Sequence, residues 1–326
     1  MKQPTALEIL LDEANKSLSV AGHAVPTWNI PGFYQDTEGH RFAKRRMEKD
    51  AQAAFTTALA YRLTGTAAYA GKAKELIMGW AVVNREITGP DGPLVSAYLG
   101  VGLVLAANWI KEFEDWSEEE RNTFTQWMTR VCLPEWDRIP LRNNWWSWSL
   151  HAQLALYRFM DDKLRFAEEV TALKEHLDHS LSIEGFIPEE ASRGKHSIWY
   201  HYFALSPVTA AAKLVLDTTG EDLFHWISPG GKSLQYAVEH FFHFANGHLK
   251  EWPYDDDPIF PAELSAGTWP LDLYEAMSIV YQNPDFERFV APYRPITGNM
   301  NINSGLYHSY AWVYPELQFQ DYIERT

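Results

Sequence analysis

The sequence predicts an all-α protein, in which helical hairpins follow one another and close into a toroid within a single domain covering residues 1–326. The first observation behind this prediction is that apolar residues recur with a 3.6-residue period in segment after segment, whereas convincing alternating strands are scarce. The second is that the connections carry glycine and proline, as in TGPDGP at 88–93. The third is the absence of any linker rich in serine, glycine or charge, which favours one domain over two.

The expected helices begin with an alanine-rich segment at 43–63, followed by Gly65, a residue type common just after helices. A second helix is expected at 67–83, and a third continues to about Trp116. Ser117 and the three glutamates after it predict an N-cap. Further helices are expected at 117–131, 146–160, 163–181, 200–217, 231–246 and 269–281. Residues 251–273, rich in Pro, Asp and aromatics, predict a long ordered loop at the rim of a cleft, and the tail from Asn299 predicts short extended pieces.

The composition is that of a folded globular protein, with 46% apolar and 22% charged residues. No run of about 18 apolar residues is evident, so we expect no helix that spans a membrane. A net charge of −15 argues against a general role on nucleic acid or anionic membranes. The single Cys132 excludes an internal disulfide and a cysteine metal cluster. We expect neither a cofactor nor a metal.

The N-terminal residues, MKQPTALEILLDEANKS, lack the apolar core of a signal peptide. A single cysteine says little about the compartment in which the chain folds. We expect a secreted or periplasmic protein whose leader has been removed, with a cytoplasmic protein as the alternative.

Aromatic residues are unusually abundant, with 14 Trp, 16 Tyr and 17 Phe. Such rings either form flat platforms for sugars or fill a core, and composition alone does not separate the two. The stretch RNNWWSWSLHAQLAL at 142–156 places two asparagines and three tryptophans at the start of a helix. We expect Asn143 and Asn144 to cap this helix. The tryptophans cannot all face one way, so one or two should stack on sugar and the rest pack inward. The three tryptophans of this stretch are Trp145, Trp146 and Trp148.

The densest group of polar side chains lies at 185–205, GFIPEEASRGKHSIWYHYFAL. Arg193, Lys195 and His196 form a basic cluster in an acidic protein. Tyr200 comes four residues after His196, on the same face of the expected helix. The plain interpretation is a helix start with solvated charges and a buried tyrosine. The functional interpretation is a site for an anionic ligand.

The order and spacing of these motifs resemble the alginate lyase superfamily. The shared features are an Asn-Asn-aromatic motif near Asn143, then G-F-x-P-E-E-x-x-R about fifty residues later, then Y-H-x-x-A-L. Residues 31–80 also look like the opening helices of these enzymes, so the resemblance covers about residues 25–315. The superfamily consists of polysaccharide lyases with an incomplete (α/α) toroid, and includes families 5 and 38, which contain glucuronan and alginate lyases. The resemblance therefore implies a polyuronate substrate.

Such a lyase removes the carbon-5 proton of a uronate and expels the carbon-4 oxygen. The site must stabilise the charge that develops on the carboxylate. It must also supply a base and an acid. The resemblance matches Asn144 to the carboxylate-binding asparagine, Tyr200 to the catalytic tyrosine and Arg193 to the arginine that accompanies it. A free tyrosine has a pKa near 10, and a nearby cation such as Arg193 is expected to favour its phenolate.

One position departs from the pattern, because family 5 has a histidine where this chain has Trp145. His196, one turn from Tyr200, and His151, seven residues after Asn144, are the candidates to replace it. Without that histidine, Tyr200 is expected to act as both base and acid on one face of the sugar, which is syn elimination. In β-linked glucuronate and mannuronate the carbon-5 hydrogen and the carbon-4 oxygen share a side. We therefore expect glucuronan as the preferred substrate and polymannuronate as the next.

Further substrate contacts are expected from Asn143, from Lys195 and, in the C-terminal segment, from Tyr307. Two rival functions remain. An (α/α)-barrel glycoside hydrolase would need two carboxylates flanking the bond, which Glu189, Glu190 and the aspartate run at 255–257 could supply. A non-catalytic polysaccharide-binding protein would keep the aromatic cleft without the reaction.

Overall fold

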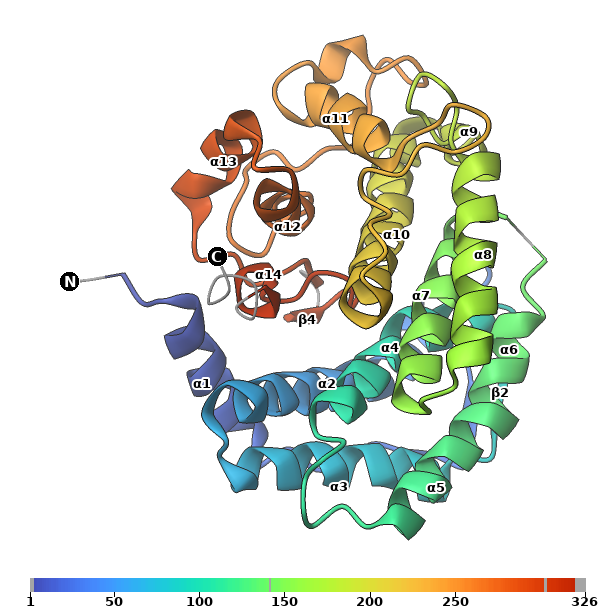
Figure 1. Ribbon diagram of the computed structural model, residues 1–326, viewed down its shortest axis with the longest axis vertical. Helices are drawn as coiled ribbons and strands as arrows, with labels where there is room; N and C mark the ends of the chain where they lie inside the picture. The colour runs from blue at the N-terminus through green and yellow to red at the C-terminus, as the bar shows by residue number, and fades with distance from the viewer. Residues whose placement is uncertain (1–2, 141, 302–303, 320–326) are drawn as a thin grey trace. The chain divides into compact units, whose positions relative to one another are not determined.

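A computed structural model describes residues 3–140, 142–301 and 304–319 of the chain (Figure 1). The chain divides into two compact units, each described by itself below. The first unit comprises Met1–Ile139, Ala155–Phe166 and Asn301–Tyr310, and the second comprises Pro140–Leu154, Ala167–Met300 and Ala311–Thr326. The prediction of a single domain stays a prediction.

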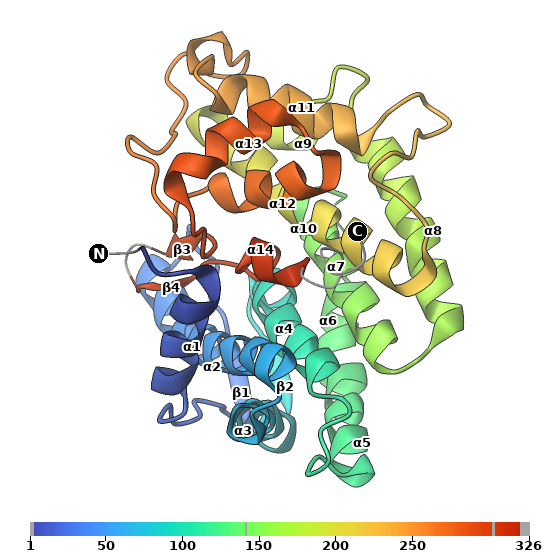
Figure 2. The same ribbon diagram turned by 60° about the vertical axis from the view of Figure 1, so that its left-hand side comes forward.

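The first unit is built from helices, with one short parallel pair of strands, β1 and β2, in which Trp28 is opposite Ile87. Helix α2 packs against α1, α3 and α4, as Figure 2 shows. The elements are α1 (Ala6–Ser17), β1 (Thr27–Asn29), α2 (Thr37–Thr64), α3 (Ala67–Val83), β2 (Glu86–Thr88), α4 (Gly92–Trp109), α5 (Glu118–Trp127), the π-helical turn η1 (Met128–Cys132) and α6 (Leu133–Asp137).

Helix α4 ends at Trp109, earlier than the predicted Trp116. Ile110, Phe113 and Trp116 are spaced by three residues and joined by two turns. The N–H of Phe113 donates to the carbonyl of Ile110 at 2.8 Å, and the N–H of Trp116 donates to the carbonyl of Phe113 at 2.9 Å. These turns bury all three side chains, which a continuing α-helix would spread over more of its circumference.

Helix α4 also has the length and the mean hydropathy, 1.3, of a membrane span, although the sequence analysis expected no such helix. It is the one helix with these properties among the described residues, and 83% of the span is buried inside the structure. A buried core helix passes the same test, so the finding is weak evidence for a membrane segment.

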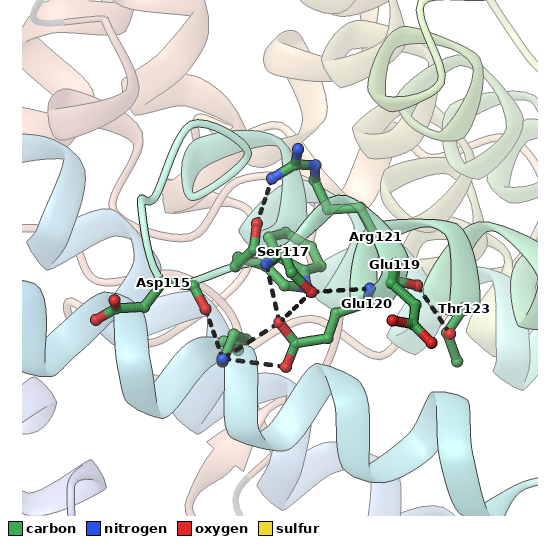
Figure 3. A network of polar contacts seen from close by, with 8 residues as sticks. Asp115, Ser117, Glu119, Glu120, Arg121 and Thr123 are labelled. Carbon is green, nitrogen blue, oxygen red and sulfur yellow. Dashed lines mark hydrogen bonds and ion pairs between the residues drawn. The ribbon is translucent and has the colours of Figure 1, made fainter.

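Helix α5 begins as predicted, at the capping box of Ser117 and Glu120 (Figure 3). The backbone N–H of Glu120 donates to Oγ of Ser117 at 3.2 Å, and the N–H of Ser117 donates to Oε2 of Glu120 at 2.9 Å. Lys74 of α3 adds bonds from its Nζ to Oε1 of Glu120 at 3.1 Å and to the carbonyl of Asp115 at 2.7 Å. The cap therefore fastens α5 to α3, and the two helices pack together.

The second unit contains the later helices. Helix α10 contacts α9 and α11, and α12 contacts α13 and α14. The elements are α7 (Asn144–Phe159), α8 (Lys163–Ser180), α9 (Pro188–Ala191), the 3-10 turn η2 (Gly194–His196), α10 (Ser197–Thr219), α11 (Leu234–Ala245), the 3-10 turn η3 (Leu249–Glu251), α12 (Leu271–Tyr281), α13 (Pro284–Val290), the 3-10 turn η4 (Ala291–Tyr293) and α14 (Pro315–Gln318). Residues 144–154 of α7 and 167–180 of α8 belong to this unit.

The two irregular segments follow their predictions in outline. Residues 252–270 form a loop without α-helix, and the N–H of Ile259 bonds the carbonyl of Lys195 at 2.8 Å. The C-terminal segment contains two short strands, β3 (Met300–Asn301) and β4 (Leu306–Tyr307). Residues 302–303, which belong to the same predicted segment, lie outside the described residues.

Candidate active site

The start of α7 is held by the cap that the sequence predicts, but only one of the two asparagines forms it. Oδ1 of Asn143 accepts the backbone N–H of Trp145 at 3.0 Å, which satisfies one of the free donors at the helix start. The side chain of Asn144 turns away from this role and bonds a glutamate from another element.

That glutamate is Glu190 on the short helix α9. Nδ2 of Asn144 donates to Oε1 and Oε2 of Glu190 at 2.9 and 3.0 Å, and the backbone N–H of Asn144 donates to Oε1 at 2.7 Å. Both side chains are completely buried. Burial raises the pKa of the Glu190 carboxyl, and the bonds from Asn144 oppose that rise. Because a carboxylate accepts but does not donate, Glu190 fixes which end of the Asn144 amide faces it.

The opposite end of that amide has no partner among the described residues. Oδ1 of Asn144 is buried and accepts no hydrogen bond. An unsatisfied buried polar atom costs stability and calls for an explanation, and a ligand that donates a hydrogen bond is one. Since only one Nδ2 hydrogen is needed for Glu190, the amide still has a donor and an acceptor to offer a ligand.

Helix α9 is positioned by His201 of α10. Nε2 of His201 accepts the backbone N–H of Ile187 at 3.1 Å, and its Nδ1 bonds the carbonyl of Ser197 at 2.8 Å. The ring must therefore be neutral, with its proton on Nδ1. Burial lowers the pKa of His201 to about 4, which agrees with this state. His201 thus has a structural task.

Arg193 and Tyr200 meet at the start of α10. The guanidinium of Arg193 lies over the Tyr200 ring, 4.8 Å from its centroid. Its Nε is 3.9 Å from Oε2 of Glu190, so the same buried carboxylate that holds Asn144 also attracts Arg193. Both Arg193 and Tyr200 are half-buried. The structure therefore brings together three predicted residues, Asn144, Arg193 and Tyr200, with Glu190 as the common neighbour of Asn144 and Arg193.

The two candidate histidines lie in different surroundings. His196 ends η2 and is exposed, next to the exposed Lys195. His151 is buried, packs beside Trp148 at 6.1 Å between ring centroids, and has its pKa lowered by burial to about 3. A ring so enclosed stays neutral near pH 7, which argues against His151 as the residue that neutralises a substrate carboxylate.

The tryptophans divide between half-buried and completely buried positions, so they do not all face one way, and their stacking on sugar stays a prediction. Trp145 and Trp146 are half-buried, and Arg142 lies over the Trp146 ring at 5.9 Å. Trp148 is completely buried and packs against Phe203, with ring centroids 5.2 Å apart. Trp148 is therefore a core residue, which corrects its place among the sugar-binding candidates.

Tyr307 also needs correction. It belongs to the first unit, where it is completely buried and its hydroxyl donates to Oε2 of Glu13 at 2.9 Å. This burial argues against a contact with sugar. Glu190, in contrast, enters the sequence analysis only within the family motif and as a possible hydrolase carboxylate, and its bonds to Asn144 are not predicted there. The one signal in the sequence is its position three residues before Arg193.

Comparisons with known proteins agree on one family. The family model described as alginate lyase matches residues 7–252, more than half of the chain. The search of curated proteins found no match.

Several solved structures share the fold at low sequence identity. An alginate lyase from Bacteroides ovatus is 16% identical with a TM-score of 0.71, and the match covers 89% of this chain and 90% of that one. Alginate lyase A1-III from Sphingomonas species A1 is 15% identical with a TM-score of 0.73, over 95% and 93% of the two chains. A tyrosine-to-phenylalanine variant of A1-III complexed with tetrasaccharide is 15% identical with a TM-score of 0.74, over 95% and 92%.

These likenesses confirm the predicted fold class, an all-α incomplete (α/α) toroid of helical hairpins. The match to the family model also confirms the resemblance that the motifs indicated. The chain belongs to the alginate lyase family and is a polysaccharide lyase.

Proposed function

We propose that the chain cleaves β-1,4-linked polyuronates by syn β-elimination, with Tyr200 as both base and acid. The observation that carries this proposal is the Arg193 guanidinium over the Tyr200 ring, 4.8 Å from its centroid, beside an Asn144 amide that Glu190 holds in place. A cation next to a phenol favours the phenolate, the form that can accept a proton.

The substrate carboxylate binds to Arg193, and it reaches the second Nδ2 hydrogen of Asn144 after a shift that uncovers this buried amide. The N-terminus of α7 adds the positive end of a helix dipole on this side. These groups stabilise the charge that moves onto the carboxylate as the carbon-5 proton leaves. The Tyr200 phenolate takes that proton. The resulting phenol gives a proton to the carbon-4 oxygen as the carbon–oxygen bond breaks, which leaves a 4,5-unsaturated uronate on one product.

Glucuronan is the proposed preferred substrate and polymannuronate the second. Trp145 stands where family 5 has a histidine, and His151 is buried, so Tyr200 is left to act from one face of the sugar. Only sugars with the carbon-5 hydrogen and carbon-4 oxygen on that face suit it. His196, exposed at the end of η2, and the half-buried Trp145 and Trp146 remain proposed substrate contacts.

Two of the similar solved structures contain an oligosaccharide, which supports a polysaccharide substrate. A tyrosine-to-phenylalanine and a histidine-to-alanine variant of A1-III were each crystallised with a tetrasaccharide. The hydrolase alternative is weakened because Glu190 is buried against Asn144 and is not open to a glycosidic bond.

The test is to mix the protein with glucuronan, polymannuronate and polyguluronate, and to follow the ultraviolet absorbance of the unsaturated uronate. We expect the fastest rise with glucuronan, then polymannuronate. A faster rise with polyguluronate would overturn the syn mechanism. Reducing ends that appear without absorbance would establish hydrolysis. Binding of the polymers with neither signal would establish a non-catalytic protein.

A further inference from the structure

A group of three side chains at the end of α11 is unrelated to the candidate active site. His243 lies in the last turn of α11, His248 follows the helix, and Glu251 ends η3. Gly247, with φ at 101°, allows the chain to fold back between them. As a result the two imidazole rings stack, with centroids 4.1 Å apart and planes 15° from parallel.

The three side chains converge on one point. Nε2 of His243 is 2.7 Å from Oε2 of Glu251, and Nδ1 of His248 is 2.9 Å from Oε1. One ligand atom from each residue lies within 4.8 Å of the other two, the one such cluster of three or more metal-ligating side chains found among the described residues. We propose that His243, His248 and Glu251 bind a zinc-like divalent cation.

The spacing suits such an ion. Zinc binds imidazole nitrogen at about 2.0–2.1 Å and carboxylate oxygen at about 2.0–2.2 Å, which separates neighbouring ligands by roughly 3.3 Å in a tetrahedral site. The ligand atoms of the three side chains are at least 2.7 Å apart and all lie within 4.8 Å of one another, a range that includes this value. The side chains of His243, His248 and Glu251 are 44%, 49% and 59% exposed, so they can turn to adjust, and water can fill the fourth position.

The ligand set indicates which cations are bound. Imidazole nitrogen suits zinc, copper, nickel and iron, whereas calcium and magnesium prefer oxygen ligands throughout. The net charge of −15 also favours cation binding in general. We therefore expect zinc to bind and calcium not to bind.

The metal site would stabilise a segment that contacts α10, the helix that carries Tyr200. Trp252, the residue after Glu251, is buried, and its Nε1 donates to Oγ of Ser197 in the first turn of α10 at 2.8 Å. A cation that joins α11 to η3 therefore fixes the start of the 252–270 loop against α10. Its role is structural, and it is independent of the proposed reaction.

Calorimetric titration of the full chain, stripped of metal and free of any histidine tag, tests the proposal. We expect one saturable zinc site per chain, no heat from calcium, and a higher Tm with zinc. The double variant His243→Ala/His248→Ala should lose both zinc effects. The matched control is His225→Ala, which removes another exposed histidine paired with one carboxylate, Asp222 at 2.7 Å, and should bind zinc like the native chain.

Glu251→Gln keeps both imidazoles and the side-chain shape, and so guards against misfolding of the double variant. Because it removes a direct ligand, it should weaken zinc binding by at least the roughly 10–100-fold typical of losing an outer partner. The absence of saturable binding in the native chain would overturn the proposal. So would a double variant, or a Glu251→Gln variant, that binds zinc as tightly as the native chain.

Discussion

The two halves of the candidate active site differ in how they are held. Asn144 and Glu190 are completely buried and joined by three hydrogen bonds of 2.7 to 3.0 Å. Arg193 and Tyr200 are half-buried and joined by a ring–cation contact, and Arg193 reaches Glu190 only at 3.9 Å. The difference separates two tasks. The buried half sets geometry, and the more open half can meet substrate and exchange protons.

The most severe test of this comparison is Tyr200→Phe. Removing the hydroxyl deletes both the base and the acid of the proposed reaction, and general acid–base groups contribute about 10²–10⁴-fold. We expect kcat on glucuronan to fall by about 10³-fold, while polymer binding and Tm change little because the ring and its contact with Arg193 remain. The measurement is the ultraviolet assay together with calorimetric binding. A variant that keeps a substantial share of the native rate would remove Tyr200 from the reaction.

Glu190→Gln tests whether the buried half of the site sets the geometry of Asn144. The substituted side chain would present an NH₂ group to the Nδ2 of Asn144, and two donors cannot bond each other. The Asn144 amide must then turn or lose a partner, which moves the donor intended for the substrate carboxylate. We expect kcat/KM to fall by about 10²-fold, the loss typical of one misplaced charge-stabilising donor. Glu189→Gln, its exposed neighbour, is the matched control and should retain activity.

A double-mutant cycle separates positioning from general stability. If Glu190 acts through Asn144, then Glu190→Gln should cost little further activity once Asn144→Ala has been made, because coupled residues are not additive. Full additivity of the two losses would show that Glu190 acts independently of Asn144. A fall in Tm that accounts for the lost activity would reduce Glu190 to a structural residue.

The sequence predicted the long elements well because they carry local signals. The apolar period identified α3 with both ends correct, and the Ser117–Glu120 capping box located the start of α5. Helix α1 was missed although Thr5 and Glu8 form the same kind of box. Helix α9, four residues long, is too short to show any period.

The site was predicted only where motif spacing sufficed. Arg193 and Tyr200, seven residues apart, were placed side by side correctly. The bond between Asn144 and Glu190 joins residues 46 positions apart, and tertiary packing alone creates it. Burial likewise decides that Trp148 and His151 belong to the core, because nothing in their local sequence separates them from Trp145 or His196.

The smallest expected effect concerns the support of the buried half by His201. Its pKa of about 4 in the folded chain lies below the ordinary value of 6.5. The unfolded chain therefore binds more protons between these values, so the stability that neutral His201 contributes is complete above pH 6.5 and is lost as pH falls towards 4. Protonation also removes the acceptor for the N–H of Ile187, and with it the anchor of α9. We expect His201 to make Tm fall as pH is lowered from 7 to 5, against the opposite slope from Asp272, whose pKa burial raises to about 7.

His201→Leu tests this assignment. It leaves the N–H of Ile187 without its acceptor, which costs about 1–3 kcal/mol for a buried donor. Between pH 7 and 5 the Tm of the variant should also fall less steeply than that of the native chain. Part of the fall should remain, because burial also lowers the pKa of His151 and of His176 to about 3. Thermal melts of both proteins across this range measure the difference. Equal slopes would show that His201 is not the group that titrates, and the link from acid pH to α9 would have to pass through another buried imidazole.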